Sequence, residues 1–156
     1  MSAMTMTDDA GVRKLNDLAD ALAAASTWIF DYRRRTPDVD HARLLNLEIA
    51  LDRTAIELRA ASIRILGEQA EDAIRALQVA AEKVEAFMEK VKRIEAALAV
   101  VNAVLGVAGA ALIGDAQGVL TTARSLDALL DENRKRKAAG RHKEAEKRDE
   151  TRLAVA

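Results

Sequence analysis

The stretch EAALAVVNAVLGVAGAALIGD, residues 95–115, decides how this chain folds. Nineteen residues without a charge lie between Glu95 and Asp115, and among them only Asn102 is strongly polar. A helix that is apolar on all sides must be buried, either in protein or in lipid. The stretch is long enough to cross a membrane. Its glycines, its alanines and Asn102 make insertion only marginally favourable, so both kinds of burial stay open here.

The composition of the whole chain is that of long helices. Of its 156 residues, 31% are charged and 3% are aromatic, and one is a proline. This profile is typical of helical bundles and coiled coils. No run alternates apolar and polar residues with a period of two, so no strand is predicted. We predict a single all-α module over residues 1–156: a four-helix bundle or coiled-coil-like array with one long central helix and a projecting apolar hairpin.

Helix breakers divide the chain into four predicted helices. Pro37 interrupts the first run, and Asp38 or Asp40 then offers a helix N-cap. Gly67 ends the second run, and the segment Gly114–Gly118 forms another glycine-bounded turn. The predicted helices are 8–35, 38–66, 68–113 and 116–138, followed by a frayed charged tail at 140–156.

The predicted second helix carries apolar residues on two opposite sides. One stripe consists of Leu44, Leu47, Leu51, Ala55, Leu58 and Ile65, and the other of Ile49, Ile56 and Ile63. A helix with two apolar sides must pack against two partners. We therefore expect it in the middle of an assembly of helices, either within one chain or between chains.

The predicted third helix repeats its apolar residues every seven positions. Two such rows form an a/d seam over about six heptads, the pattern of a coiled-coil helix. The rows are Leu77, Val84, Val91, Leu98, Leu105 and Leu112, and Ala73, Ala80, Phe87, Ile94, Val101 and Ala108. The seam passes residue 95 without a change of phase, so we predict one helix whose apolar half projects beyond its neighbours. The predicted membrane or partner surface of that half consists of Ala96, Val100, Ala103, Val104, Val107, Ala110 and Ile113.

A second candidate surface is basic. Residues 134–143 hold six Lys and Arg residues and no acid, which suits a solvated helix end, attraction to an anionic membrane surface or weak contact with nucleic acid. This predicted patch consists of Arg134, Lys135, Arg136, Lys137, Arg141 and Lys143. The net charge of the chain is −1, and no aromatic residue follows Phe87. A nucleic-acid partner is therefore not expected.

The sequence lacks several common catalytic motifs. It has no cysteine, which excludes thiol chemistry, and no glycine-rich phosphate loop, nucleophile elbow or HExxH motif. Asp38 and His41 could suggest a metal ligand pair, but one such pair beside a turn is typical of a helix cap. A metal-binding bundle would need several inward carboxylates. We predict a protein that is not an enzyme and that binds no cofactor, metal or small-molecule substrate.

Two hypotheses of function follow. The leading one is membrane association through the hairpin 96–130, as conditional insertion, a pore or an anchor. In outline, an apolar hairpin on a helical bundle is similar to helical pore-forming toxins, and Ala-rich amphipathic bundles resemble lipid-granule coat proteins. The alternative is a soluble coiled-coil protein that self-associates, or binds a partner helix, through the same surface. We expect a homo-oligomer. No signal peptide is predicted at the start, so a cytoplasmic or membrane-associated location is expected.

Overall fold

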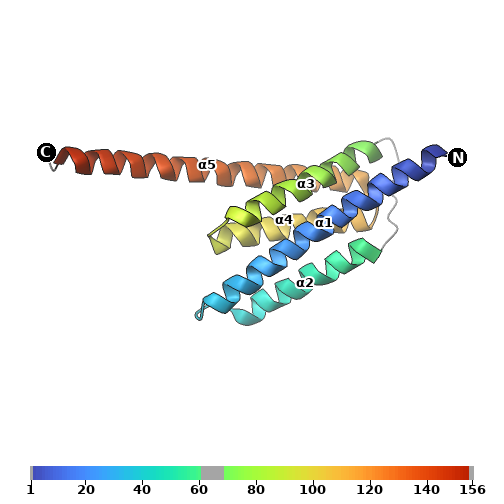
Figure 1. Ribbon diagram of the computed structural model, residues 1–156, viewed down its shortest axis with the longest axis horizontal. Helices are drawn as coiled ribbons and strands as arrows, with labels where there is room; N and C mark the ends of the chain where they lie inside the picture. The colour runs from blue at the N-terminus through green and yellow to red at the C-terminus, as the bar shows by residue number, and fades with distance from the viewer. Residues whose placement is uncertain (1, 61–68, 155–156) are drawn as a thin grey trace.

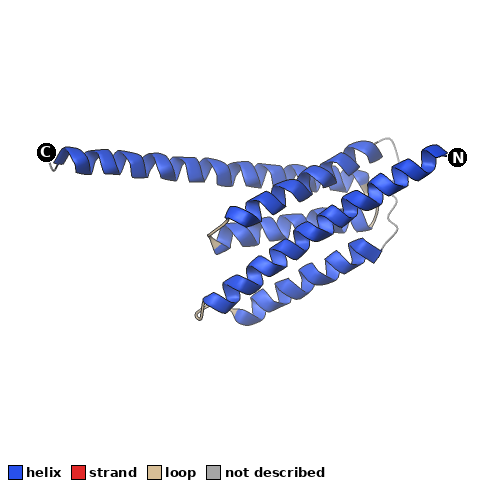
Figure 2. Cartoon of the chain, in the orientation of Figure 1, coloured by secondary structure: helices blue, strands red, loops and turns tan. Residues whose placement is uncertain are grey.

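The structure, a computed structural model, describes residues 2–60 and 69–154, and all regular secondary structure in these ranges is helical (Figure 2). Side chains are described for residues 15–60, 69–136 and 138–151. The helices are α1 (Ser2–Arg35), α2 (His41–Ala60), α3 (Ala70–Lys90), α4 (Ile94–Leu112) and α5 (Ala116–Ala154). They pack against one another around a shared apolar core. The prediction of an all-α helical bundle is confirmed.

The helices run back and forth along a common direction (Figure 1). The hairpin of α1 and α2 packs against α3 through α1, and α5 packs against both α3 and α4. Helix α4 is the one that contacts all four others. The apolar stretch therefore lies inside the assembly of helices rather than at a projecting tip.

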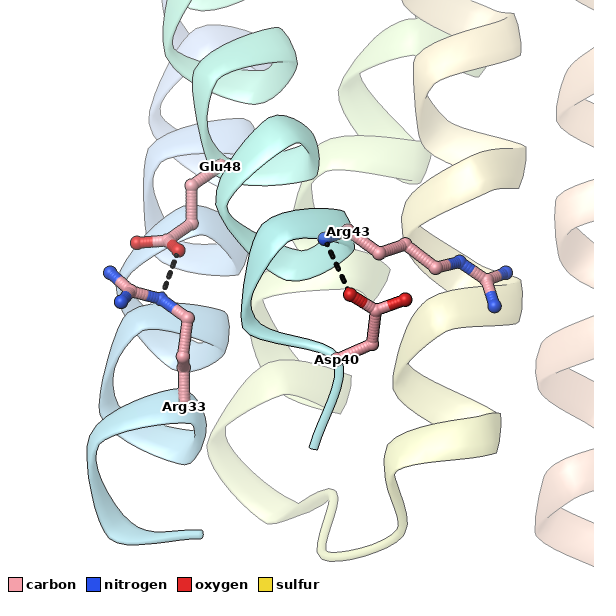
Figure 3. Close-up of polar contacts among 4 residues, drawn as sticks. All are labelled: Arg33, Asp40, Arg43 and Glu48. Atoms are coloured by element: carbon pink, nitrogen blue, oxygen red, sulfur yellow. Dashed lines mark hydrogen bonds and ion pairs between the residues drawn. The ribbon is translucent and has the colours of Figure 1, made fainter. Parts of the chain in front are cut away.

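The predicted break between the first two helices, at residues 36–40, is confirmed. Helix α1 ends at Arg35 and α2 begins at His41. The Oδ1 atom of Asp40 accepts a hydrogen bond from the backbone N–H of Arg43 at 3.1 Å (Figure 3). This bond satisfies one of the free N–H groups in the first turn of α2.

The predicted turn after residue 113 is also confirmed. Gly114 has a φ of 72°, a left-handed conformation that glycine adopts at little cost. Its N–H donates to the carbonyl of Ala111, and that of Asp115 donates to the carbonyl of Ala110, which together close the end of α4. Asp115 then caps α5, because its Oδ1 accepts the N–H of Gly118 at 3.0 Å.

The single helix predicted over 68–113 is instead two helices. The chain is extended at Val91 (ψ 137°) and at Arg93 (ψ 127°), and α4 folds back alongside the bundle. The indole Nε1–H of Trp28 on α1 donates to the carbonyl oxygen of Val91 at 3.3 Å. This bond compensates a carbonyl that lost its helical partner. Folding back at this point buries the apolar faces of α4 that a continuous helix would leave uncovered.

The predicted end of the last helix is corrected as well. Helix α5 continues to Ala154, where a frayed tail from residue 140 was expected. The element that projects from the bundle is this charged end of α5, and not an apolar hairpin (Figure 1). Gly67, Ile63 and Ile65, which entered the prediction of the second helix, lie outside the described residues.

Candidate interaction surfaces

The surface predicted for residues 96–113 is divided between the core and the exterior. Val100, Val104 and Val107 are fully buried in the bundle. The alanines at positions 96, 103 and 110 are half-buried, whereas Ile113 is 79% exposed at the end of α4. Only part of the predicted set is therefore available to a partner while the bundle is closed.

The outer face of α4 is smooth and only weakly apolar. Its exposed residues are Glu95, Asn102, Gly106 and Gly109, and their spacings of seven, four and three place them on one side of the helix. A Cβ atom added at Gly109 would meet nothing within 4 Å. Helix α4 is nevertheless long and apolar enough to cross a membrane by length and composition, although seven of its 19 residues are buried in the bundle.

An exposed apolar row runs along the outside of α2. Leu45, Ile49 and Ile56 are 43%, 50% and 64% exposed. Their spacing of four and seven residues places them on one side of the helix. The other side of α2 is packed in the core through Leu44, Leu51, Ala55 and Leu58. The predicted two-sided apolar pattern of this helix thus has one side covered and one side, the α2 row, uncovered.

Two ion pairs join α1 to α2, the helix that carries the α2 row. The Arg33 Nε atom lies 2.8 Å from Oε2 of Glu48, a pair of which little is exposed (Figure 3). A more exposed pair joins Arg59 to Asp20 at 2.9 Å. The Arg33 guanidinium also lies over the ring of Phe30, 5.6 Å from its centroid. Phe30 is itself 40% exposed and extends the apolar surface onto α1.

The predicted basic patch lies on the projecting part of α5. Arg134, Lys135, Arg136, Arg141 and Lys143 are all exposed. Lys137 belongs to the same helix, and its side chain lies outside the described set. An ion pair between Arg136 and Glu132, one helical turn apart, supports this part of the helix at 2.9 Å.

Further cations lie where α5 leaves the bundle. Lys83 on α3 pairs with Asp127 on α5 at 2.8 Å, and the two helices run in the same direction (Figure 1). Seven residues further along each helix, Lys90 is level with Arg134. Lys90, Lys92 and Arg93 are exposed in and beside the α3–α4 turn, at the end of the bundle past which α5 projects (Figure 1). This arrangement depends on the interruption of the helix at residues 91–93, and no glycine or proline in the sequence predicts that interruption.

Five acidic side chains on α1 and α3 lie close enough to influence one another. Burial raises the pKa of Glu85 above its ordinary value of 4.5, and nearby carboxylates raise it further. We call these carboxylates and Glu85 the acidic group: Asp17, Asp20, Glu82, Glu85 and Glu89. In the described residues, no three His, Asp or Glu side chains are arranged to hold a metal ion. His41 is exposed at the start of α2.

Comparison of the chain with protein-family models, with curated proteins and with solved structures gave no match in any of the three.

Proposed function

We propose that this protein is a non-catalytic assembly protein whose copies associate through the α2 row. The observation that carries the proposal is the exposure of Leu45, Ile49 and Ile56 along one side of a helix whose other side is buried. Single exposed aliphatic residues are common on protein surfaces. A row of them with helical spacing is the arrangement by which two helices pack side by side.

A second copy of the chain is the partner that we propose for this surface. Exposed charges of both signs accompany the row: Asp52 lies in line with it, between Ile49 and Ile56, and Arg53 and Glu57 lie beside it. An identical surface therefore does not meet repulsion of a single sign. Two α2 helices that pack antiparallel about a point near residue 50 bring Leu45 of one copy opposite Ile56 of the other. Such a self-complementary contact is the usual basis of a two-fold symmetric dimer.

The test is the oligomeric state of a charged variant. Ile49→Glu with Ile56→Glu places carboxylates inside the proposed contact, and both residues are at least half exposed, so the bundle itself should stay folded. Sedimentation velocity over a range of concentrations should show dimers for the wild type and monomers for the variant. Val79→Glu is the matched control, because Val79 is a similarly exposed aliphatic residue, 42%, on α3. A wild type that stays monomeric at every concentration would exclude the proposal.

Membrane association remains a second proposal, favoured by the length and hydropathy of α4. Insertion would require Val100, Val104 and Val107 to leave the core. The bundle would therefore have to open, and α4 would act as a conditional membrane segment. The energy gained must exceed the loss of core packing around α4, so insertion would need a trigger such as an anionic surface or low pH.

Asn102→Lys tests the membrane proposal without disturbing the bundle. Asn102 is exposed near the middle of α4, so the new ammonium group reaches water in the folded protein. A Lys at the centre of a membrane-spanning helix costs roughly 2.5–3.5 kcal/mol. Flotation with anionic liposomes at low pH should show binding of the wild type and loss of binding for the variant. Gln117→Lys adds the same charge on α5 and should leave flotation unchanged. Equal flotation of wild type and Asn102→Lys would rule out insertion of α4.

A further inference from the structure

The second half of α5 is a helix without packing partners in the described part of the chain. Leu130 is the last residue of α5 that packs against the core, and described side chains from Arg134 to Thr151 are all exposed. Figure 1 shows this half of α5 extending well past the other helices. A helix that is polar all round gains nothing from apolar packing, so its function must come from its charges. We call residues 134–143 the basic arm.

The cations of the basic arm surround the helix. Successive residues of an α-helix point about 100° apart. Arg134 and Arg141 therefore share one side, Lys135 a second, and Arg136 with Lys143 a third. A cation on each of several sides suits a partner that encloses the helix, rather than a partner that touches one side of it.

The cations at the base of the arm add to this field. Lys90, Lys92 and Arg93 come from the α3–α4 turn and lie level with the start of the arm, as the pair between Lys83 and Asp127 fixes. Two segments that are about forty residues apart in the sequence thus present cations at the same end of the bundle. The arm itself carries no acid, whereas the acidic group lies on α1 and α3 and the helix beyond the arm holds Glu144, Glu146, Asp149 and Glu150.

We propose that the basic arm binds duplex nucleic acid by entering the major groove. An α-helix with its side chains is about 10–12 Å across, and the major groove of B-form DNA is about 12 Å wide. Phosphates line both walls of that groove, so cations on several sides of one helix are all within reach of a phosphate. Because phosphate contacts carry no sequence information, this binding is independent of sequence and strongly salt-dependent.

An anionic membrane is a poorer match for the same arm. Helices that lie on a membrane carry an apolar face opposite the charged one. Residues 131–152 contain no Val, Ile, Leu, Met or aromatic residue, and alanine and Gly140 are the only non-polar positions there. A flat surface would also leave the cations on the far side of the helix without partners. The acidic group would repel phosphates from the bundle, so that the arm approaches the duplex first.

The experiment compares two variants that lose the same charge. Arg134, Lys135, Arg136 and Lys137 are replaced by Gln in the arm variant, and Arg35, Arg43, Arg75 and Arg124 are replaced by Gln in the control. The control arginines are exposed on the bundle, away from the arm. Fluorescence anisotropy with a short labelled DNA duplex of mixed sequence measures the affinity as a function of salt. Vesicles of phosphatidylserine and phosphatidylcholine serve as the membrane probe.

The arm variant should lose duplex affinity roughly tenfold or more at low salt, and the slope of log K against log salt should fall by about 3–4, because four phosphate contacts are removed. The control variant should keep the wild-type slope. No duplex binding by the wild type, or equal losses in the two variants, would overturn the proposal. Tighter binding of the wild type to the vesicles than to the duplex would overturn it in favour of a membrane partner.

Two substitutions at Gly140 test whether the arm must be helical to bind, or whether its positive charge is enough. A Cβ atom at Gly140 would meet nothing within 4 Å, so Gly140→Ala stabilises the helix without new contacts. Gly140→Pro keeps every charge but breaks the helix within the arm. Groove binding requires that Gly140→Pro weakens duplex affinity several-fold and that Gly140→Ala does not. Equal affinities for the two would show that helical structure is irrelevant and would overturn docking in the groove.

Discussion

Asn133 is the residue at which the packed part of α5 gives way to the arm. It lies seven positions after Leu126 and fourteen after Val119, both of which are fully buried. Its amide nitrogen is buried and has no hydrogen-bond partner among the described residues. A buried donor without a partner loses its hydration and gains nothing in return. Asn133 therefore lies on the side of α5 that faces the core, where its polar amide lowers the stability of the bundle relative to an apolar side chain.

We expect Asn133→Leu to stabilise the bundle by about 1 kcal/mol, because it removes the unpaired donor and extends the apolar side of α5. Thermal unfolding followed by circular dichroism measures the change. Asn102→Leu, on the exposed side of α4, is the control and should leave the midpoint nearly unchanged. A midpoint lowered by Asn133→Leu would mean that the amide has a partner in solution.

Glu85 makes stability depend on pH. Its pKa is raised in the folded chain by burial and by the other members of the acidic group. The folded chain therefore binds the proton more tightly than the unfolded chain does, and stability is lost as pH rises from the ordinary pKa of 4.5 through the raised value. Glu85→Gln should raise the unfolding midpoint at pH 7 but not at a pH below 4.5. Glu57→Gln on α2 controls for net charge. If Glu85→Gln raised the unfolding midpoint in acid as much as at pH 7, the raised pKa of Glu85 would not be the cause.

At the scale of helices, local signals in the sequence predicted well and the long-range fold-back could not be predicted. Pro37 with Asp40, and Gly114 with Asp115, marked two turns because their conformations and caps are set by neighbouring residues. The turn at 91–93 has no such signal. The apolar repeat of α3 continues into α4 in phase, and the break depends on Trp28, which is more than sixty residues away. The same error turned the valines of α4 from core residues into an expected surface.

A pair of lysine substitutions on α4 tests which side of this helix is buried. Val107→Lys puts an unpaired charge into the core, where it should cost roughly 3–5 kcal/mol. Asn102→Lys, on the outer side, should change stability by less than about 0.5 kcal/mol. Chemical denaturation of both variants gives the two values. Similar small effects would indicate that the back of α4 is exposed, as a projecting hairpin would have it.

At the scale of the whole molecule, the positions of the charged and apolar surfaces bear on the choice of partner more than the net charge does. A net charge of −1 argues against a polyanionic partner when the chain is taken as a whole. The acidic group lies on α1 and α3, whereas the basic arm belongs to the part of α5 that projects from the bundle (Figure 1). The α2 row lies on a further helix, at the edge of the bundle. Composition alone could not reveal this layout, because it depends on which helices are neighbours.

Disulfide crosslinking tests association through α2 most directly. The chain has no cysteine, so a single introduced cysteine reports only contacts between copies. In an antiparallel contact centred near residue 50, position 49 of one copy lies close to position 49 of the other. Mild oxidation of the Ile49→Cys variant should give a covalent dimer in high yield, whereas Val79→Cys on α3 should stay monomeric. Equal yields for the two variants, or no dimer for Ile49→Cys, would contradict the proposed interface.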